Sequence, residues 1–436
     1  MKINIYLIGL LSLFVEVLLK YQKSEHHYQD FTNINVNKTV NLINNIVEVT
    51  TSIQIRNNQI DPADVYRVPY FKNSTSNLLF IEASMKSTDE EDETNIKIKV
   101  HKQHAAHDNF TFYDLSFRSE PMNHEEERLI IIKEFYYNQY EMLPKSISIL
   151  EDQLSLYRGV YNYLTFYETL EQTTRFILPN LSGKNKIIDY TKDFAAIDEN
   201  KIIYKLVEPV EPLKALDTKI HFESNIPYYE LNYAEKTVDI SHWGNIVVEE
   251  KFEVVHTGAK LIGEFGRVDF SSRGPKKGGR NSLAGLVAIL PIKANNLWYR
   301  DEIGNVSTSY SEREWDNVKM DLEFRFPLLG GWKNSFNIGY NLPSKFFISQ
   351  NNAGDYKLKI NFGFPFNQVL AKAYTLRVIL PENAYISKID LPLHESYKVS
   401  YETTYSFLDF FGRTTAVITI NNCFFIHDIP LEVSIL

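Results

Sequence analysis

Polar and apolar residues alternate one by one along several stretches of this 436-residue chain. The clearest examples are residues 96–100 (Ile-Lys-Ile-Lys-Val), 320–326 (Met-Asp-Leu-Glu-Phe-Arg-Phe) and 356–362 (Tyr-Lys-Leu-Lys-Ile-Asn-Phe). A period of two places one set of side chains on a core and the other set in water, which is typical of antiparallel sheets. Amphipathic patterns of helical period are scarce, and we expect at most a minor helix, within residues 144–161. The alternation predicts a mainly β fold.

The composition and the turn residues agree with this prediction. The chain holds 27 Tyr and 28 Phe, residue types that favour the pleated, half-buried surface of a sheet. Proline and glycine interrupt the alternating runs at residues 326–327, 330–331 and 364–365, as the turns of a β-sandwich require. We therefore expect antiparallel β-sandwich-like domains.

An internal echo suggests how many such domains there are. Residues 38–42 (Lys-Thr-Val-Asn-Leu) recur as residues 236–240 (Lys-Thr-Val-Asp-Ile), and Asn-Ile-Val at 45–47 recurs at 245–247. Each copy leads into a β-like segment, so we interpret the two halves as related domains in tandem. The expected domains are residues 25–232 and 233–436.

Charge and cysteine content exclude several classes of protein. The net charge of −9 argues against a nucleic-acid-binding protein, because no basic face is evident. Cys423 is the only cysteine, so neither an internal disulfide nor a thiolate metal cluster can form. We expect Cys423 to be a buried strand residue.

The N-terminus reads as a targeting segment. Lys2 precedes an apolar stretch over residues 5–15, and polar sequence begins near Lys20. This pattern is typical of a signal peptide, which we place at residues 1–24, with an approximate boundary. An uncleaved anchor is the alternative, although the apolar run is shorter than the ~20 residues that span a bilayer.

Five short blocks in the second half stand out. They are Ser241-His-Trp-Gly-Asn-Ile246, residues 298–309 (Trp-Tyr-Arg-Asp-Glu-Ile-Gly-Asn-Val-Ser-Thr-Ser), residues 325–333 (Arg-Phe-Pro-Leu-Leu-Gly-Gly-Trp-Lys), Gly339-Tyr-Asn-Leu-Pro343 and Phe407-Leu-Asp-Phe-Phe-Gly-Arg413. In this order the blocks closely resemble the ribophorin I family, which is subunit 1 of the oligosaccharyltransferase complex of the endoplasmic reticulum. The resemblance is strong over residues 235–415 and diffuse over residues 30–235.

The resemblance implies a function without catalysis. Members of this family are β-rich on the luminal side of the membrane and are non-catalytic subunits of the complex that transfers an oligosaccharide from dolichyl diphosphate to Asn of Asn-x-Ser/Thr. It implies as partners the other subunits, including a polytopic catalytic one, nascent polypeptides and the translocon. The resemblance implies a transmembrane helix and a cytoplasmic segment after the luminal part, and neither occurs before residue 436, so we expect a truncated chain, with a chain held at the membrane only by its partners as the alternative. A soluble secreted β-sandwich binding module is the alternative.

The chain carries glycan acceptors of its own. Asn-x-Ser/Thr sequons begin at five asparagines, and the sequon at Asn305 is the best supported because a glycan is expected there in ribophorin I-like proteins. A purely structural role of Gly304-Asn305 as a turn remains the other interpretation. The remaining four candidates are Asn37, Asn73, Asn109 and Asn180.

The block around Asn305 is also the candidate partner surface. Arg300, Asp301 and Glu302 form either an ion-paired turn or a docking surface for other subunits. Trp243 and Trp332 are interpreted first as core or inter-domain residues, with a role in an interface as the alternative. The predicted partner surface consists of Trp298, Arg300, Asp301, Glu302 and Trp332.

The candidate motifs for catalysis or for binding a metal or cofactor are incomplete in this sequence. The sequences after His124 and His394 lack the second histidine of a zinc-protease helix. His101, His104 and His107 are spaced by three, which on a strand places successive side chains on opposite faces. An enzyme on a peptidase-like β scaffold is therefore a remote alternative, and we expect no catalytic residue, metal or cofactor.

Overall fold

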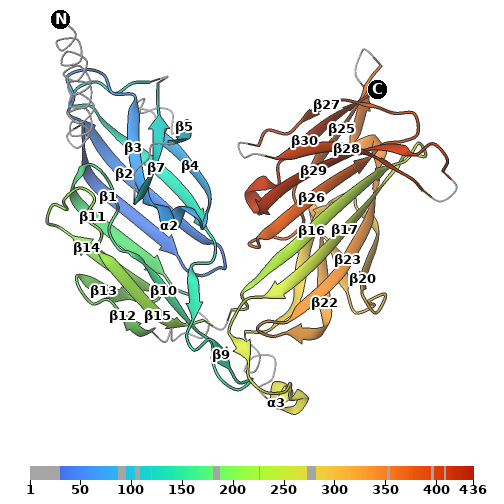
Figure 1. Cartoon of the computed structure of the whole chain (residues 1–436), viewed down its shortest axis with the longest axis horizontal. Helices are drawn as coiled ribbons and strands as arrows, with labels where there is room; N and C mark the ends of the chain where they lie inside the picture. Colours follow the sequence, from blue (N-terminus) through green and yellow to red (C-terminus); the bar gives the residue numbers. More distant parts are fainter. Residues whose placement is uncertain are drawn as a thin grey trace, which may run out of the picture. The chain divides into compact units, whose positions relative to one another are not determined.

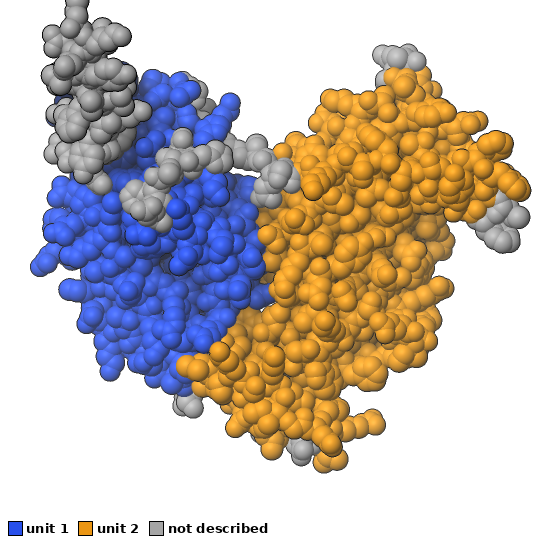
Figure 2. Space-filling model, in the orientation of Figure 1, with its two compact units in different colours: residues 1–141, 155–223 blue, residues 142–154, 224–436 orange. Residues whose placement is uncertain are grey.

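The computed structural model describes residues 30–86, 95–103, 109–118, 120–179, 187–224, 226–272, 281–350, 354–393, 397–406 and 409–436. The chain divides into two compact units, which Figure 2 shows in different colours. Unit 1 comprises Met1–Glu141 and Ser155–Glu223, and unit 2 comprises Met142–Leu154 and Ser224–Leu436. Strands dominate both units, so the predicted mainly β fold is confirmed (Figure 1). The expected signal peptide lies outside the described residues.

Unit 1 is built on a ten-stranded sheet beside a four-stranded one. The order in the large sheet is β13 (Ala195–Asp198), β14 (Lys201–Leu206), β11 (Glu168–Ile177), β1 (Phe31–Asn41), β2 (Val47–Asn57), β7 (Glu127–Tyr136), β4 (Leu78–Lys86), β5 (Asn95–Gln103), β6 (Phe110–Ser116) and β3 (Val65–Phe71). The order in the small sheet is β12 (Ile187–Tyr190), β15 (Asp217–Glu223), β10 (Leu154–Val160) and β8 (Tyr140–Met142).

Two hydrophobic cores hold unit 1 together. At one end the large sheet folds back on itself, so that Tyr66 of β3 packs on Phe31 of β1, with ring centroids 5.6 Å apart, and donates a hydrogen bond to Asn33. At the other end the large sheet faces the small one, and Phe176 and Tyr204 pack with Phe222 in a second cluster. This second core lies between two sheets, as in a sandwich.

Unit 2 consists of a seven-stranded sheet and three smaller ones. The order in the seven-stranded sheet is β20 (Asn295–Asp301), β23 (Lys333–Pro343), β17 (Asn245–His256), β16 (Tyr229–Ile240), β26 (Ala371–Ile379), β29 (Arg413–Cys423) and β28 (Lys398–Thr404). The smaller sheets are β19 (Leu283–Pro291), β22 (Asn317–Leu328) and β21 (Tyr310–Arg313); β24 (Ile348–Gln350), β25 (Tyr356–Asn361), β30 (Pro430–Ile435) and β27 (Ile386–Asp390); and β18 (Lys260–Leu261) with β9 (Ser146–Ile147).

One continuous core fills unit 2. Inward residues of the seven-stranded sheet, such as Val248 and Tyr340, pack against residues of the facing strands, such as Leu322 of β22 and Leu358 of β25. The alternation that predicted strands over residues 320–326 and 356–362 sets this burial, because every second residue there points into the core, except at Phe326 and Tyr356, which are exposed. Cys423 is fully buried at the end of β29, as predicted.

The echoing sequence strings lie at the same place in the two large sheets. In unit 1, β1 pairs antiparallel with β2 and parallel with β11. In unit 2, β16 pairs antiparallel with β17 and parallel with β26. Each large sheet therefore contains one parallel pair in an otherwise antiparallel arrangement. Lys38 and Lys236 occupy matching positions in the first strands.

Helices are short. They are α2 (Lys72–Thr75), α3 (Arg267–Ser272) and the 3-10 turns η2 (Ser344–Phe346) and η3 (Phe425–His427). The expectation of a helix within residues 144–161 was wrong, because β9 and β10 occupy that stretch. Among the helices of the described residues, none has the length and apolar character needed to cross a bilayer.

Candidate functional site

A tight turn at the end of β20 presents Asn305 to solvent. The Asp301 N–H donates to Gly304 O (3.0 Å), and the Val306 N–H donates to Tyr299 O (3.0 Å). Gly304 has φ +142°, a conformation that favours glycine and fits its prediction as a turn residue. Val306 and Tyr299 are buried, so the turn is anchored on the core while the Asn305 side chain remains exposed.

The carboxylate of Asp301 organises this turn. Its Oδ1 accepts hydrogen bonds from the N–H groups of Ile303 (3.0 Å) and Gly304 (2.9 Å), and its Oδ2 pairs with Arg325 Nε. Arg325 also donates to Asn305 O (3.0 Å). Burial acts to raise the pKa of Asp301, but the hydrogen bonds from Arg325 and the two backbone N–H groups outweigh it and lower the pKa. The ion-paired interpretation of the 300–302 segment is therefore realised at Asp301.

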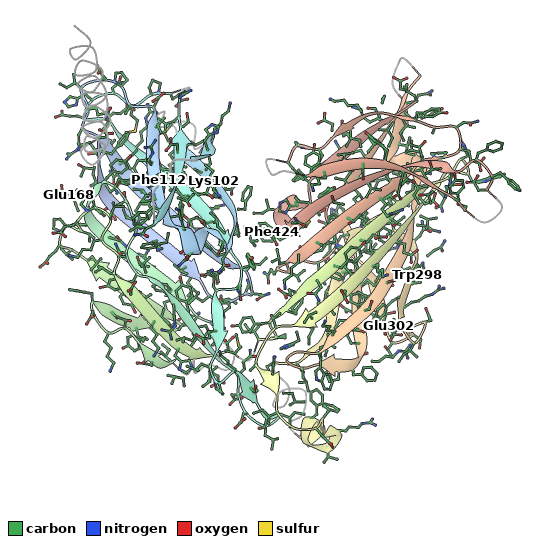
Figure 3. The ribbon with its side chains drawn as sticks, in the orientation of Figure 1. Lys102, Phe112, Glu168, Trp298, Glu302 and Phe424 are labelled. Atoms are coloured by element: carbon green, nitrogen blue, oxygen red, sulfur yellow. The ribbon has the colours of Figure 1, made fainter. Side chains whose placement is uncertain are left out.

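The indole of Trp298 covers a glycine on the neighbouring strand. Trp298 of β20 lies directly opposite Gly339 of β23, and a Cβ atom on Gly339 would lie 2.1 Å from the indole. The guanidinium of Arg300 stacks on the same indole, 4.8 Å from the ring centroid. Figure 3 shows Trp298 and Glu302 along this edge of unit 2. An aromatic ring over a glycine at a sheet edge fixes the strand register.

Part of the predicted partner surface lines a shallow hollow. The hollow has a volume of about 400 Å³, and its lining includes Asp301, Glu302 and the exposed apolar residues Ile303 and Phe326. Trp332 does not line it. The Trp332 ring instead packs against the core and against Phe265, with ring centroids 5.7 Å apart. Of the five predicted surface residues, Asp301 and Glu302 thus line the hollow, and Trp298 and Arg300 contact each other on β20.

A second cluster joins the first and last of the five sequence blocks. Arg413 forms a bidentate pair with Asp239 of β16 (2.6 and 2.8 Å), and Asp409 caps the Phe411 and Gly412 N–H groups. Trp243 lies in the turn between β16 and β17 and lines a hollow with Asp409 and Arg413. Its side chain is 94% exposed, so the core interpretation of Trp243 was wrong.

The other sequons differ in accessibility. Asn73 in α2 and Asn109 before β6 are exposed. Asn37 is half-buried within β1, and its amide contacts Asn35 Oδ1 and Arg175 Nη1, both at 3.4 Å. Asn180 lies outside the described residues.

Histidines do not converge in the described part of the chain. His101 is exposed, whereas His104, His107 and His394 fall outside the described residues. The His124 ring contacts Gln59 O at 3.0 Å. Within the described ranges, no group of three or more His, Cys, Asp or Glu side chains is placed to hold a metal ion.

Sequence reasoning missed a buried glutamate and a nearby lysine in each unit. Lys236 and Glu250 are buried on β16 and β17, and Glu134 is buried on β7, near the partly buried Lys38 of β1. Burial lowers the pKa of Lys38 to about 8, against the opposing charge of Glu134. The signal was available, because Lys236 stands between Ala234 and Val238 at an inward position of an alternating strand.

The sequence model of the family described as "Ribophorin I" matches residues 31–434. The chain belongs to the ribophorin I family. The family match therefore extends over both units, including the first half of the chain, where the resemblance was diffuse.

Curated relatives carry the same assignment. "Dolichyl-diphosphooligosaccharide--protein glycosyltransferase subunit 1B" of Arabidopsis thaliana is 29% identical over 98% of this chain and 90% of the relative. The subunit 1B of Oryza sativa subsp. japonica is 29% identical over 92% of this chain and 84% of the relative. Subunit 1 of Caenorhabditis elegans is 30% identical, over 89% of this chain and 64% of the relative. Among solved structures, yeast LTA4 hydrolase covers 48% of this chain and 32% of its own, with 7% identity and a TM-score of 0.29, too low to support an inference.

Proposed function

We propose that this ribophorin I-family chain is a non-catalytic subunit of the oligosaccharyltransferase complex. In this role it supports the transfer of a preassembled oligosaccharide from dolichyl diphosphate to Asn of Asn-x-Ser/Thr in nascent proteins. The observation that carries the proposal is the family match over residues 31–434, together with relatives that are named subunit 1 of this glycosyltransferase. These names favour the complex over a soluble secreted binding module.

The proposed place of action is the luminal face of the endoplasmic reticulum membrane. There the chain binds other subunits, including the polytopic one that performs catalysis, and lies close to nascent polypeptides and the translocon. The turn of residues 301–306 and the hollow beside it are the proposed contact with another subunit. Two features support this choice: the exposed apolar side chains of Ile303 and Phe326, and a backbone held rigid by the Asp301–Arg325 pair.

Co-isolation tests the proposal. An affinity-tagged full chain is recovered from detergent-solubilised microsomes, and the eluate is offered a lipid-linked oligosaccharide and an Asn-x-Thr peptide. We expect glycopeptide formation in the eluate, and less of it when Phe326→Asp is introduced in the proposed contact. Tyr356→Asp, another exposed aromatic residue of unit 2, is the matched control. An eluate of wild-type chain without transfer activity would refute the proposed function.

A further inference from the structure

A cavity inside the sandwich of unit 2 has a charged floor. Its volume is about 290 Å³. Lys236, Glu250 and Tyr340 from three adjacent strands form the floor, and apolar residues from both layers form the walls. The apolar walls include Val238, Val248, Leu342 and Phe364, and the rim includes Lys359 and Asp428.

The floor presents one hydrogen-bond acceptor and one donor that the protein leaves available. Lys236 Nζ donates to Asn361 O (3.1 Å) and Gly363 O (2.8 Å), which uses two of its three N–H groups. Glu250 Oε1 accepts from the Tyr340 hydroxyl (2.8 Å), whereas Glu250 Oε2 is buried and has no hydrogen-bond partner. Lys236 and Glu250 are direct cross-strand partners, so both groups face the same small space.

Unit 1 shows what a completed version of this arrangement looks like. Lys38 matches Lys236 and donates to Val160 O and Asn162 O, both at 3.2 Å. The carboxylate is supplied there by Glu134, and both of its oxygens are satisfied, by the hydroxyls of Tyr70 and Tyr136. Each lysine thus donates two hydrogen bonds to backbone carbonyls, and the two units differ at the carboxylate: both oxygens of Glu134 are satisfied, whereas Glu250 Oε2 has no partner. Buried polar atoms without partners are rare in proteins and point to a ligand or an ordered solvent molecule.

We propose that the unit 2 cavity binds a polyhydroxylated ligand of monosaccharide size. One hydroxyl group can donate to Glu250 Oε2 while a neighbouring hydroxyl accepts from Lys236. A vicinal diol can form both hydrogen bonds simultaneously. A charged ligand is disfavoured, because a carboxylate would meet Glu250 and an amine would meet Lys236. The apolar walls suit the C–H faces of a pyranose ring, and Lys359, Asn361 and Asp428 supply further polar groups at the rim.

The size of the cavity agrees with this class of ligand. Cavities that bind drug-sized molecules measure roughly 300–1,000 Å³, so this one suits a single sugar ring. A small carboxamide would engage the floor alone and leave the rim groups unused. The proposal does not depend on the role in the oligosaccharyltransferase complex, because the cavity belongs to unit 2 alone.

Ligand-observed NMR on the purified full chain tests the proposal. The chain's own glycans are first removed enzymatically, and methyl glucopyranoside, methyl mannopyranoside and N-acetylglucosamine are then titrated separately. We expect saturable binding of at least one pyranoside and none of 2-methoxytetrahydropyran, which has the ring without hydroxyls. Glu250→Gln and Lys236→Met should each weaken binding at least tenfold. Glu134→Gln in unit 1 is the matched control and should leave the affinity unchanged.

Thermal unfolding separates a binding role from a structural one. Glu250→Gln keeps the shape of the side chain but leaves the buried Lys236 without its opposing charge, so a lower melting temperature is expected, and binding is compared at a temperature where the variant is still folded. A wild-type chain that binds no pyranoside would overturn the proposal. Undiminished binding by Glu250→Gln, or binding of propionamide in place of the sugars, would overturn it equally.

Discussion

At the scale of single residues, two aspartates perform the same task in different loops. Asp301 and Asp409 each accept hydrogen bonds from the N–H groups two and three residues further on, and each turn closes with a glycine at positive φ. A side chain that caps its own turn in this way replaces backbone hydrogen bonds that the loop cannot make. This explains why Asp-x-x-Gly appears in two of the sequence blocks that mark the family.

Substitution of Asn305 tests the use of the exposed turn as a glycan acceptor. Asn305→Gln removes the sequon but retains a polar side chain, so the chain expressed through the secretory route should migrate faster by one glycan. Enzymatic deglycosylation should bring wild type and variant to the same mobility. If mobility before deglycosylation is the same in both, Asn305 carries no glycan and its role is that of a turn residue.

Substitution of Gly339 tests the packing of Trp298. In Gly339→Ala the new methyl group occupies space that the indole fills, and such overpacking costs about 1–3 kcal/mol of unfolding free energy. Denaturant unfolding measures this cost. In a Trp298→Ala background, Gly339→Ala should be close to neutral, because the clash is gone. An equal cost in both backgrounds would show that the indole does not lie over Gly339 in solution.

At the scale of elements, the end of β17 is held by a neutral histidine. His256 is buried; its Nδ1 accepts from the Gly258 N–H (3.1 Å), and its Nε2 lies 2.5 Å from Asn281 O, which requires the Nε2–H tautomer. Burial lowers the pKa of His256 to about 4, although the bond to Asn281 acts to raise it. One side chain therefore ties the end of β17 to the chain just before β19.

The protonation of His256 predicts acid sensitivity. The folded pKa of about 4 lies below the ordinary value of 6.5, so the unfolded chain binds more protons in this interval. Stability is thus fully present above pH 6.5 and falls as the pH drops towards 4, by up to about 3 kcal/mol. His256→Gln, which keeps one donor and one acceptor, should flatten this slope in denaturant unfolding measured across the interval. His124→Gln, at an exposed histidine, should leave it unchanged. A slope that survives in His256→Gln would contradict the assignment.

The sequence predicted elements better than it predicted sites. The alternation at residues 320–326 and 356–362 identified strands, because burial of one face of a sheet leaves a period of two. The stretch 144–161 misled, since its spacing of apolar residues fits a short helix as well as the β9–β10 segment. Trp243 could not be placed because a large aromatic residue is equally compatible with a core and with an exposed turn.

Long-range pairing accounts for what remained hidden. Asp301 and Arg325 are 24 residues apart in the sequence. They form an ion pair because Asp301 ends β20 and Arg325, on β22, lies beside the turn that follows β20. The same holds for Lys236 and Glu250, whose relation follows from the strand register. The sequence could have indicated that both residues are buried, because each occupies an inward position in an alternating strand. It could not have indicated that they line the same cavity.

At the scale of the whole molecule, the two units repeat one arrangement of strands. The order β11-β1-β2-β7 in unit 1 corresponds to β26-β16-β17-β23 in unit 2, with a parallel pair at the same place in each. We propose that this correspondence reflects two related domains, as the sequence echo suggested. Two units built on large sheets offer extended surfaces for partners, which agrees with the proposed role as a supporting subunit.

The central proposal is that this ribophorin I-family chain supports glycan transfer without performing it. The most direct measurement compares the purified chain alone with the intact assembly, each supplied with lipid-linked oligosaccharide and an Asn-x-Thr peptide. We predict glycopeptide from the assembly, a lower yield from an assembly depleted of this chain, and no glycopeptide from the chain alone. Glycopeptide formed by the isolated chain, or an assembly that transfers equally well after depletion, would contradict the account.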